Sequence, residues 1–302
     1  MSKTKAWIGA ARLRTLPLSI SGIIMGTALA AMYGHSDKAI FVLALLTTIG
    51  FQITSNFAND YGDGIKGTDN EERIGPKRAY QSGLLSRREL KNGIILSCVC
   101  NTILVIALVY FSFGLENLGY VLLFAVLGMA SIWAALKYTI GSSAYGYKGF
   151  GDIFVFLFFG FLAVLGSMFL YTKFLTWTSV LPAVTIGLLS VGVLNLNNLR
   201  DVESDRKSGK NTLIVQMGFE RGKRYHYMIL ITSFLAMLVF TTYHFTVWGN
   251  LIHLLVFIPV FLHFRKVYKT NTPIFLDPEL KKLALSTLLL AVLFYFSFNI
   301  FL

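Results

Sequence analysis

Two short stretches of the 302-residue chain gather carboxylate and amide side chains at helical spacing. The first stretch holds four of them at i, i+3, i+4 and i+7: Asn56, Asn59, Asp60 and Asp63. The second holds Asn197, Asp201 and Asp205 at i, i+4 and i+8, with Asn198 beside them. On a continuing helix such residues share one face, where like charges repel one another, and more strongly if solvent is partly excluded. The pattern therefore predicts a bound cation.

The types of ligand limit which cation fits these stretches. Neither stretch contains Cys, and the only histidine nearby is His226, which argues against a zinc site with nitrogen and sulfur ligands. Oxygen ligands favour Mg²⁺ or Ca²⁺, and no EF-hand calcium loop is present. Mg²⁺ takes few carboxylates and completes its shell with substrate phosphates, which suits two separated aspartate pairs. We therefore expect Mg²⁺.

Cationic residues follow each acidic stretch. They are Lys66, Arg73, Lys77 and Arg78 after the first, and Arg206, Lys207 and Lys210 after the second. A metal-bridged phosphate with Arg and Lys contacts is a common way to hold a diphosphate and to stabilise it as a leaving group. Any one of these cations could instead set topology or contact lipid headgroups. The carboxylates, however, serve no topological purpose, so the whole arrangement predicts a diphosphate site.

Most of the remaining chain is apolar. Hydrophobic residues make up 55% of it and charged residues only 14%, against about 25% charged residues in a soluble domain. A bilayer-spanning helix needs about 20 mostly apolar residues. Nine runs meet that need: 16–34, 39–58, 92–112, 117–136, 152–171, 177–196, 226–244, 247–264 and 283–301. We therefore predict an all-α membrane protein with no separate soluble domain.

The net charge of +12 follows the topology of these spans. With the amino terminus inside, only Lys38 and Lys173 of the 27 Lys and Arg residues fall in outer segments. This is the positive-inside rule, so the basic charge does not require nucleic acid as a partner. The segment 3–30 also resembles a signal peptide, but Gly22 and Gly26 stand at helix-packing spacing and favour a first span that belongs to the bundle.

The two acidic stretches follow the second and the sixth span. Four spans lie between them, and an even number preserves orientation. This predicts two parallel four-helix repeats, about 1–150 and 151–270, plus a ninth helix, with the two stretches facing each other across a central cavity. A membrane location suits a prenyl diphosphate, because its tail partitions into lipid while its head stays at the interface.

These residues resemble the UbiA superfamily of intramembrane prenyltransferases. The resemblance covers nearly the whole chain and is carried by Asn59-Asp60-Tyr61-Gly62-Asp63, Gly67-Thr68-Asp69, Arg73-Ile74-Gly75-Pro76, Gln81-Ser82-Gly83 and the run 201–210. Within the superfamily, the segments 14–17, 67–70 and 197–201 look most like the 1,4-dihydroxy-2-naphthoate polyprenyltransferases of menaquinone biosynthesis.

The resemblance implies nine helices around a cavity open to the bilayer, and two Mg²⁺ ions that bridge a polyprenyl diphosphate. It places Asp60, Asp63 and Asp69 on one ion, and Asp201 and Asp205 on the other. Substrate contacts are expected from Asn56, Asn59, Arg73, Lys77, Arg78, Asn197, Asn198, Arg206 and Lys210, with Arg14, Lys148 and Asp152 as further candidates.

The implied reaction begins with ionisation of the donor to an allylic cation. The naphthoate ring then attacks through its carboxyl-bearing carbon, and loss of CO₂ gives the demethylmenaquinol skeleton. The implied location is the bacterial cytoplasmic membrane, with the amino terminus and both aspartate motifs on the cytoplasmic side. Membrane lipid is then a further partner, and the oligomeric state is left open.

Two positions depart from the superfamily pattern. Gly67 stands where the last aspartate of the first motif is expected, and the acid appears at Asp69. The Tyr-x-x-x-Lys element of several relatives is missing, although Lys137 or Lys148 could replace its lysine. Asp152 could contact the acceptor or simply cap a helix.

Two alternative functions stay open. One is a prenyltransferase of the same superfamily that acts on another ring, such as 4-hydroxybenzoate. The other is a secondary transporter, which is disfavoured because the centres of the predicted spans carry no charge, whereas a carrier needs ionisable groups near mid-membrane.

Overall fold

The computed structural model describes residues 2–68 and 78–300, so the predicted site residues Asp69, Arg73 and Lys77 lie outside the described ranges. Within these ranges all regular structure is helical. Nine described segments are long and apolar enough to span a membrane: Lys3–Met32, Lys38–Lys66, Arg87–Phe113, Leu118–Lys137, Gly151–Thr172, Trp177–Arg200, Phe219–Tyr243, Trp248–Lys269 and Pro273–Asn299. The prediction of an all-α bundle with nine spans is confirmed, and the chain is a multi-pass membrane protein.

Several of these spans are composite. The first consists of α1 (Lys3–Ala11), η1 (Leu13–Thr15) and α2 (Leu16–Met32), and the fifth of α6 (Gly151–Val155), the π-helix η3 (Phe156–Gly166) and α7 (Ser167–Thr172). The other long elements are α3 (Lys38–Lys66), α4 (Arg87–Phe113), α5 (Leu118–Lys137), α8 (Val180–Arg200), α11 (Phe219–Tyr243), η5 (Trp248–Val256), α12 (Phe257–Lys269) and α13 (Asp277–Asn299). Short elements complete the chain: η2 (Tyr145–Tyr147), η4 (Trp177–Ser179), α9 (Val202–Lys207), α10 (Leu213–Met217) and η6 (Pro273–Leu276).

Several helices run beyond the apolar segments that predicted them. The third span was expected from residue 92, but α4 already begins at Arg87, because Ser86 and Glu89 form a capping box. The Ser86 hydroxyl accepts a hydrogen bond from the Glu89 amide at 3.2 Å, and the Glu89 carboxylate accepts one from the Ser86 amide at 2.8 Å. Such caps satisfy the first amides of a helix and let polar turns extend past the hydrocarbon layer.

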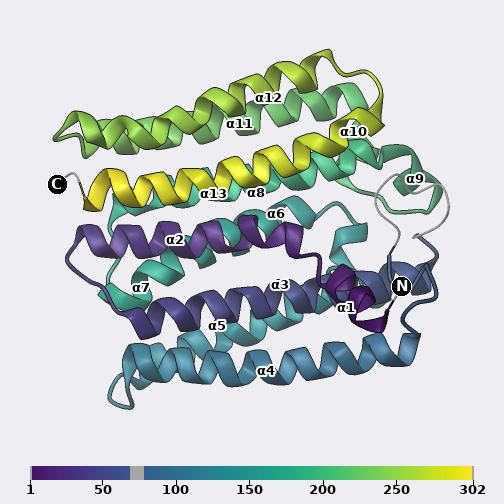
Figure 1. The fold of residues 1–302 in the computed structure, drawn as a ribbon, viewed down its shortest axis with the longest axis horizontal. Coiled ribbons are helices and arrows are strands. Elements are labelled where there is room, and N and C mark those ends of the chain that lie inside the picture. The colour runs from purple at the N-terminus through teal and green to yellow at the C-terminus, as the bar shows by residue number, and fades with distance from the viewer. Residues whose placement is uncertain (1, 69–77, 301–302) are drawn as a thin grey trace.

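The helices lie side by side along the long axis of the molecule (Figure 1). α3, α4 and α5 form one side, α11 and α12 form the opposite side, and α2, α8 and α13 lie between them. α1, α9 and α10 gather at the end of the bundle that carries the amino terminus, which we call the polar end. The carboxyl terminus lies at the opposite end. The two acidic stretches therefore reach the same end of the bundle, whereas the internal repeat stays a prediction.

Two glycines of α2 allow the fifth span to approach closely. A Cβ atom at Gly22 would lie 2.9 Å from the carbonyl oxygen of Phe159. At Gly26 it would overlap the carbonyl oxygen of Val164 and lie 2.7 Å from the Cβ of Ser167. Small residues at such contacts let helix backbones meet in a membrane. The first span is thus an integral part of the bundle, as the glycine spacing predicts.

We expect the substitution Gly26→Ala to lower the free energy of unfolding by about 1–3 kcal/mol, because the added Cβ atom would overlap a backbone atom of η3. Thermal or denaturant unfolding of the detergent-purified protein measures this. Gly9→Ala is the matched control, since a Cβ at Gly9 meets nothing within 4 Å. Equal stability of the two variants would contradict the close packing of α2 on η3.

Candidate active site

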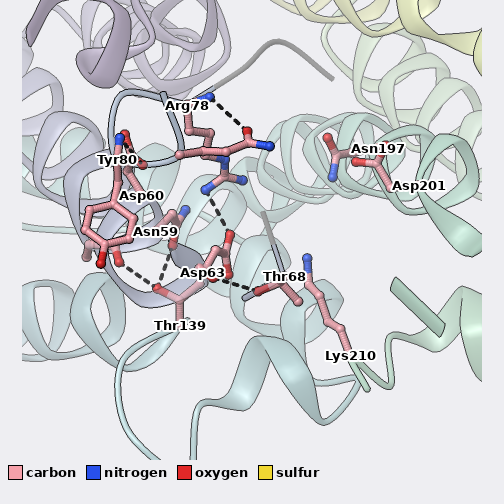
Figure 2. A network of polar contacts seen from close by, with 12 residues as sticks. Asn59, Asp60, Asp63, Thr68, Arg78, Tyr80, Thr139, Asn197, Asp201 and Lys210 are labelled. Atoms are coloured by element: carbon pink, nitrogen blue, oxygen red, sulfur yellow. Dashed lines mark hydrogen bonds and ion pairs between the residues drawn. The ribbon is translucent and has the colours of Figure 1, made fainter. Parts of the chain in front are cut away.

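Asp63 is the centre of the first acidic cluster. It lies in the last turn of α3, and its Oδ2 forms an ion pair with Arg78 Nη1 at 2.8 Å (Figure 2). Its Oδ1 accepts a hydrogen bond of 2.7 Å from the hydroxyl of Tyr147. That hydroxyl lies 2.5 Å from Oγ1 of Thr68, just beyond the helix. The buried carboxylate is therefore neutralised and held from two directions.

Asp60 and Asn56, on the same helix, face other partners. The carboxylate of Asp60 accepts hydrogen bonds from the backbone amides of Ala79, at 3.2 Å, and Tyr80, at 3.4 Å. The amide of Asn56 donates to the carbonyl oxygen of Ala11 at 2.8 Å. Asp60 thus fixes the segment that delivers Arg78, and Asn56 ties α1 to α3.

Arg200 organises the second acidic cluster. Its guanidinium is 2% exposed and donates to both carboxylate oxygens of Asp201, through Nε at 2.8 Å and Nη2 at 2.6 Å. Nη2 also donates to the side-chain oxygen of Asn197 at 2.9 Å, and Nη1 pairs with Asp277 of α13 at 2.5 Å. One arginine therefore links the end of α8 to the start of the last span.

Asp205 and Lys210 form a further ion pair, with 3.6 Å between Asp205 Oδ1 and Lys210 Nζ. Burial raises the pKa of the Asp205 carboxyl to about 6, and the charges of Asp201 and Asp63 add to this shift, which Lys210 opposes. Oδ2 of Asp205 is buried and has no hydrogen-bond partner among the described residues. The carboxylate can therefore accept a further positive group.

One cavity of about 760 Å³ joins the two clusters. Asn59, Asp63 and Arg78 line it from the first cluster, while Asn197, Arg200 and Lys210 line it from the second. Figure 2 shows Asp63, Arg78, Asn197 and Lys210 around the same space. The rest of the lining is largely apolar and aromatic, with Phe124, Tyr138, Phe154, Phe158, Phe159 and Leu162 among the residues. The charged part of the cavity, which we call its head, therefore adjoins a larger and mostly apolar part, which we call its body.

The oxygen donors at the head of the cavity fit Mg²⁺. Among the described residues no three His, Cys, Asp or Glu side chains gather into a ready metal cluster. Mg²⁺ does not need one, because it is commonly held by one or two carboxylates, water and substrate phosphates. Asp63 lines the cavity, and Asp205 lies outside the lining but has an oxygen that is unpartnered among the described residues. Both carboxylates interact electrostatically with Lys210, which lines the cavity.

The UbiA prenyltransferase family matches residues 19–274. The chain belongs to this family. It is a prenyltransferase, similar to the 1,4-dihydroxy-2-naphthoate octaprenyltransferase of Escherichia coli (strain K12), with 41% identity over 296 residues, which covers 97% of this chain and 95% of that protein. The enzyme of the same name from Haemophilus influenzae is 42% identical over 294 residues, again covering 97% and 95%.

Solved structures share the fold of this UbiA family member. A UbiA homolog from Archaeoglobus fulgidus bound to DMAPP and Mg²⁺ has a TM-score of 0.62 at 14% identity, covering 96% of this chain and 99% of that chain. A structure of digeranylgeranylglyceryl phosphate synthase has a TM-score of 0.62 at 17% identity, covering 99% of both chains. The family and the nine-helix fold implied by the sequence motifs are therefore confirmed.

The remaining predicted residues of this prenyltransferase lie in different surroundings. Arg14 lines the cavity. Arg206 is exposed and pairs with Glu203 at 3.1 Å. Lys148 is also exposed and lies outside the cavity lining, and Asn198 is buried in α8 outside it.

Asp152 lies in the first turn of α6 and is only 7% exposed. It interacts with the hydroxyl of Tyr225 on α11 and lies outside the cavity lining. The structure thus places this carboxylate between two helices, and its contact with the acceptor stays a prediction.

Two residues of the site have roles that the sequence does not predict. One is Tyr147, next to Lys148, whose hydroxyl donates a hydrogen bond to Asp63. Nζ of Lys66 lies over the Tyr147 ring, 3.8 Å from the ring centre. Arg200 directly precedes Asp201, but the positive-inside rule accounted for it as a topology determinant. Neither role carries a local signal, because the decisive partners, Asp63 and Asp277, are 84 and 77 residues away.

We expect Arg200→Met to lower the free energy of unfolding by about 3–5 kcal/mol, since it leaves the buried carboxylate of Asp201 without its counter-ion. Unfolding of the purified protein measures the change. Arg206→Met removes an exposed pair and is expected to cost at most about 1 kcal/mol. The role of Arg200 would be refuted by two equally stable variants.

Proposed function

We propose that this prenyltransferase moves a polyprenyl group from polyprenyl diphosphate to 1,4-dihydroxy-2-naphthoate with loss of CO₂, giving demethylmenaquinol in menaquinone biosynthesis. The observation that carries the proposal is the single cavity whose head is lined by Asp63, Arg78 and Lys210 and whose body is apolar. Relatives at 41% and 42% identity bear the name of this activity. The cavity offers each part of such a donor a matching environment.

The charged head of the cavity holds the diphosphate in this proposal. Asp63 and Asp205 would hold Mg²⁺, and Arg78 and Lys210, which pair with these carboxylates, would contact phosphate oxygens. When bound, Mg²⁺ would neutralise the charge that develops on the departing diphosphate. The oxygens of Asn59 and Asn197 lie at the same head. Metal roles for Asp60, Asp69 and Asp201 stay predictions.

The apolar body of the cavity takes the isoprenoid tail. Each buried methylene is worth about 0.8 kcal/mol, so binding of the tail is driven by the same effect that keeps it in the bilayer. Phe158, Phe159 and Tyr138 line this part, and their π-faces can stabilise an allylic cation. The aromatic walls also exclude water, which would otherwise capture the cation.

The final steps of the proposed reaction transfer the prenyl group to the aromatic acceptor. The carbon–oxygen bond to the diphosphate breaks first, its electrons leave with the diphosphate, and an allylic cation forms. A bond then forms between the first carbon of this cation and the carboxyl-bearing ring carbon. The bond to the carboxyl group then breaks, its electrons return to the ring, and CO₂ leaves. We further propose that the polar end faces the cytoplasm of a bacterial inner membrane, as the positive-inside rule indicates.

Asp63→Asn and Asp205→Asn should each reduce turnover about 100-fold or more, because each removes a negative ligand needed for the metal-bridged diphosphate. The test is release of pyrophosphate from polyprenyl diphosphate and the naphthoate in the presence of Mg²⁺, with a chelator expected to abolish it. Glu203→Gln is the matched control, since Glu203 is an exposed carboxylate of the same segment. Full turnover by either aspartate variant would overturn the site assignment.

The identity of the acceptor is tested by assaying several aromatic acceptors with one polyprenyl diphosphate donor. We expect prenylated product and CO₂ from 1,4-dihydroxy-2-naphthoate, and little product from 4-hydroxybenzoate. Activity with 4-hydroxybenzoate alone would keep the reaction type but overturn the acceptor.

A further inference from the structure

A chain of buried ionisable residues links three helices outside the diphosphate site. His226 of α11 lies with its Nε2 2.9 Å from Nε2 of His263 on α12. Nδ1 of His263 lies 2.7 Å from Oε2 of Glu279 on α13, and Oε1 of Glu279 lies 2.6 Å from Nζ of Lys282. His226, His263 and Glu279 are at most 3% exposed. Ionisable groups buried in a membrane bundle usually serve a function.

The hydrogen bonds of this chain have a consistent direction. Nδ1 of His226 is buried without a partner among the described residues, so a neutral His226 carries its proton on Nε2 and donates it to His263. His263 then donates through Nδ1 to the ionised Glu279, which leaves both histidines neutral. The carboxylate of Glu279 is the only negative charge of the four, and Lys282 is its counter-ion.

Lys282 is the point where the chain meets the cavity. Its side chain is 63% exposed and lines the same cavity as Asp63 and Arg78. An ammonium group has three N–H donors, and Glu279 takes one of them. The other donors can bind an anion in the cavity.

The position of Lys282 separates its anion from the diphosphate. On α13 it follows Asp277, the partner of Arg200, by five residues, or about 7.5 Å of helix rise. The cations that pair with Asp63 and Asp205, the aspartates proposed to hold Mg²⁺, are instead Arg78 and Lys210. The acceptor supplies a second anionic group, its carboxylate. This group lies close to the reacting atoms, because the ring carbon that carries it is the carbon that is prenylated.

We propose that Lys282 binds the carboxylate of the acceptor, and that the buried chain of Glu279, His263 and His226 positions it. This inference rests on the proposed function. Lys282 is a binding residue, whereas Glu279 and the two histidines act through it as positioning residues. The arrangement selects an acceptor that is both aromatic and anionic, and it turns the carboxyl-bearing carbon toward the head of the cavity.

The test uses the full-length purified enzyme and two competitive inhibitors, 1-hydroxy-2-naphthoate and 1-naphthol, which differ by one carboxylate. We expect Lys282→Met to raise the KM for the naphthoate acceptor about tenfold, because a charged hydrogen bond is lost. The affinity for the inhibitor 1-hydroxy-2-naphthoate should fall by the same factor. Binding of 1-naphthol and the KM for the donor should not change. Lys282→Arg should restore most of the affinity.

Two further variants sharpen the result. Lys281→Met removes the neighbouring cation, which also lines the cavity but lacks the Glu279 contact, and should change the acceptor KM less than twofold. Glu279→Gln should raise the acceptor KM several-fold and leave the donor KM unchanged.

Three results would overturn the inference: equal weakening of both inhibitors by Lys282→Met, a rise of the donor KM, or an equal effect of Lys281→Met. An unchanged acceptor KM in Lys282→Met, with normal wild-type turnover, would overturn it too and leave the proposed function intact. Absence of wild-type turnover of the naphthoate would overturn the proposed function itself, and this inference with it.

Discussion

Charge neutralisation at one end of an apolar bundle is the constraint on which this structure depends. The carboxylates of Asp63, Asp201 and Asp205 are buried, and an isolated buried charge is very costly. Each is therefore paired with a cation, and all three cations, Arg78, Arg200 and Lys210, line the cavity. The same cations suit a diphosphate, so a metal-bound substrate can replace one set of ion pairs by another without leaving any charge unpaired.

The last span connects the parts of the site. Its first turns carry Asp277, which holds Arg200, and Glu279, which holds Lys282. Because α13 packs against both α2 and α8, a single helix sets the position of the second acidic cluster and of Lys282 in the cavity lining. The close glycine contact of α2 with η3 positions two further elements that line the cavity. The packing of these helices therefore determines the geometry of the site.

The sequence predicts the spans well, because a run of about 20 apolar residues is long enough to cross the hydrocarbon layer and is rare in soluble helices. It also predicts that both acidic clusters reach one end, since that follows from the even number of spans between them. It does not predict the partners of the carboxylates. Arg200 and Asp277 are 77 residues apart, and His226 and His263 are 37 apart. Only tertiary packing brings such pairs together, and hydropathy carries no information on it.

The most direct test of the account is calorimetric titration of inorganic pyrophosphate into the purified protein, with and without Mg²⁺. If the two acidic clusters hold a diphosphate through metal ions, binding requires Mg²⁺ and weakens at least tenfold when either Asp63 or Asp205 is changed to Asn. Equal affinity with and without Mg²⁺, or no effect of either substitution, would contradict the account.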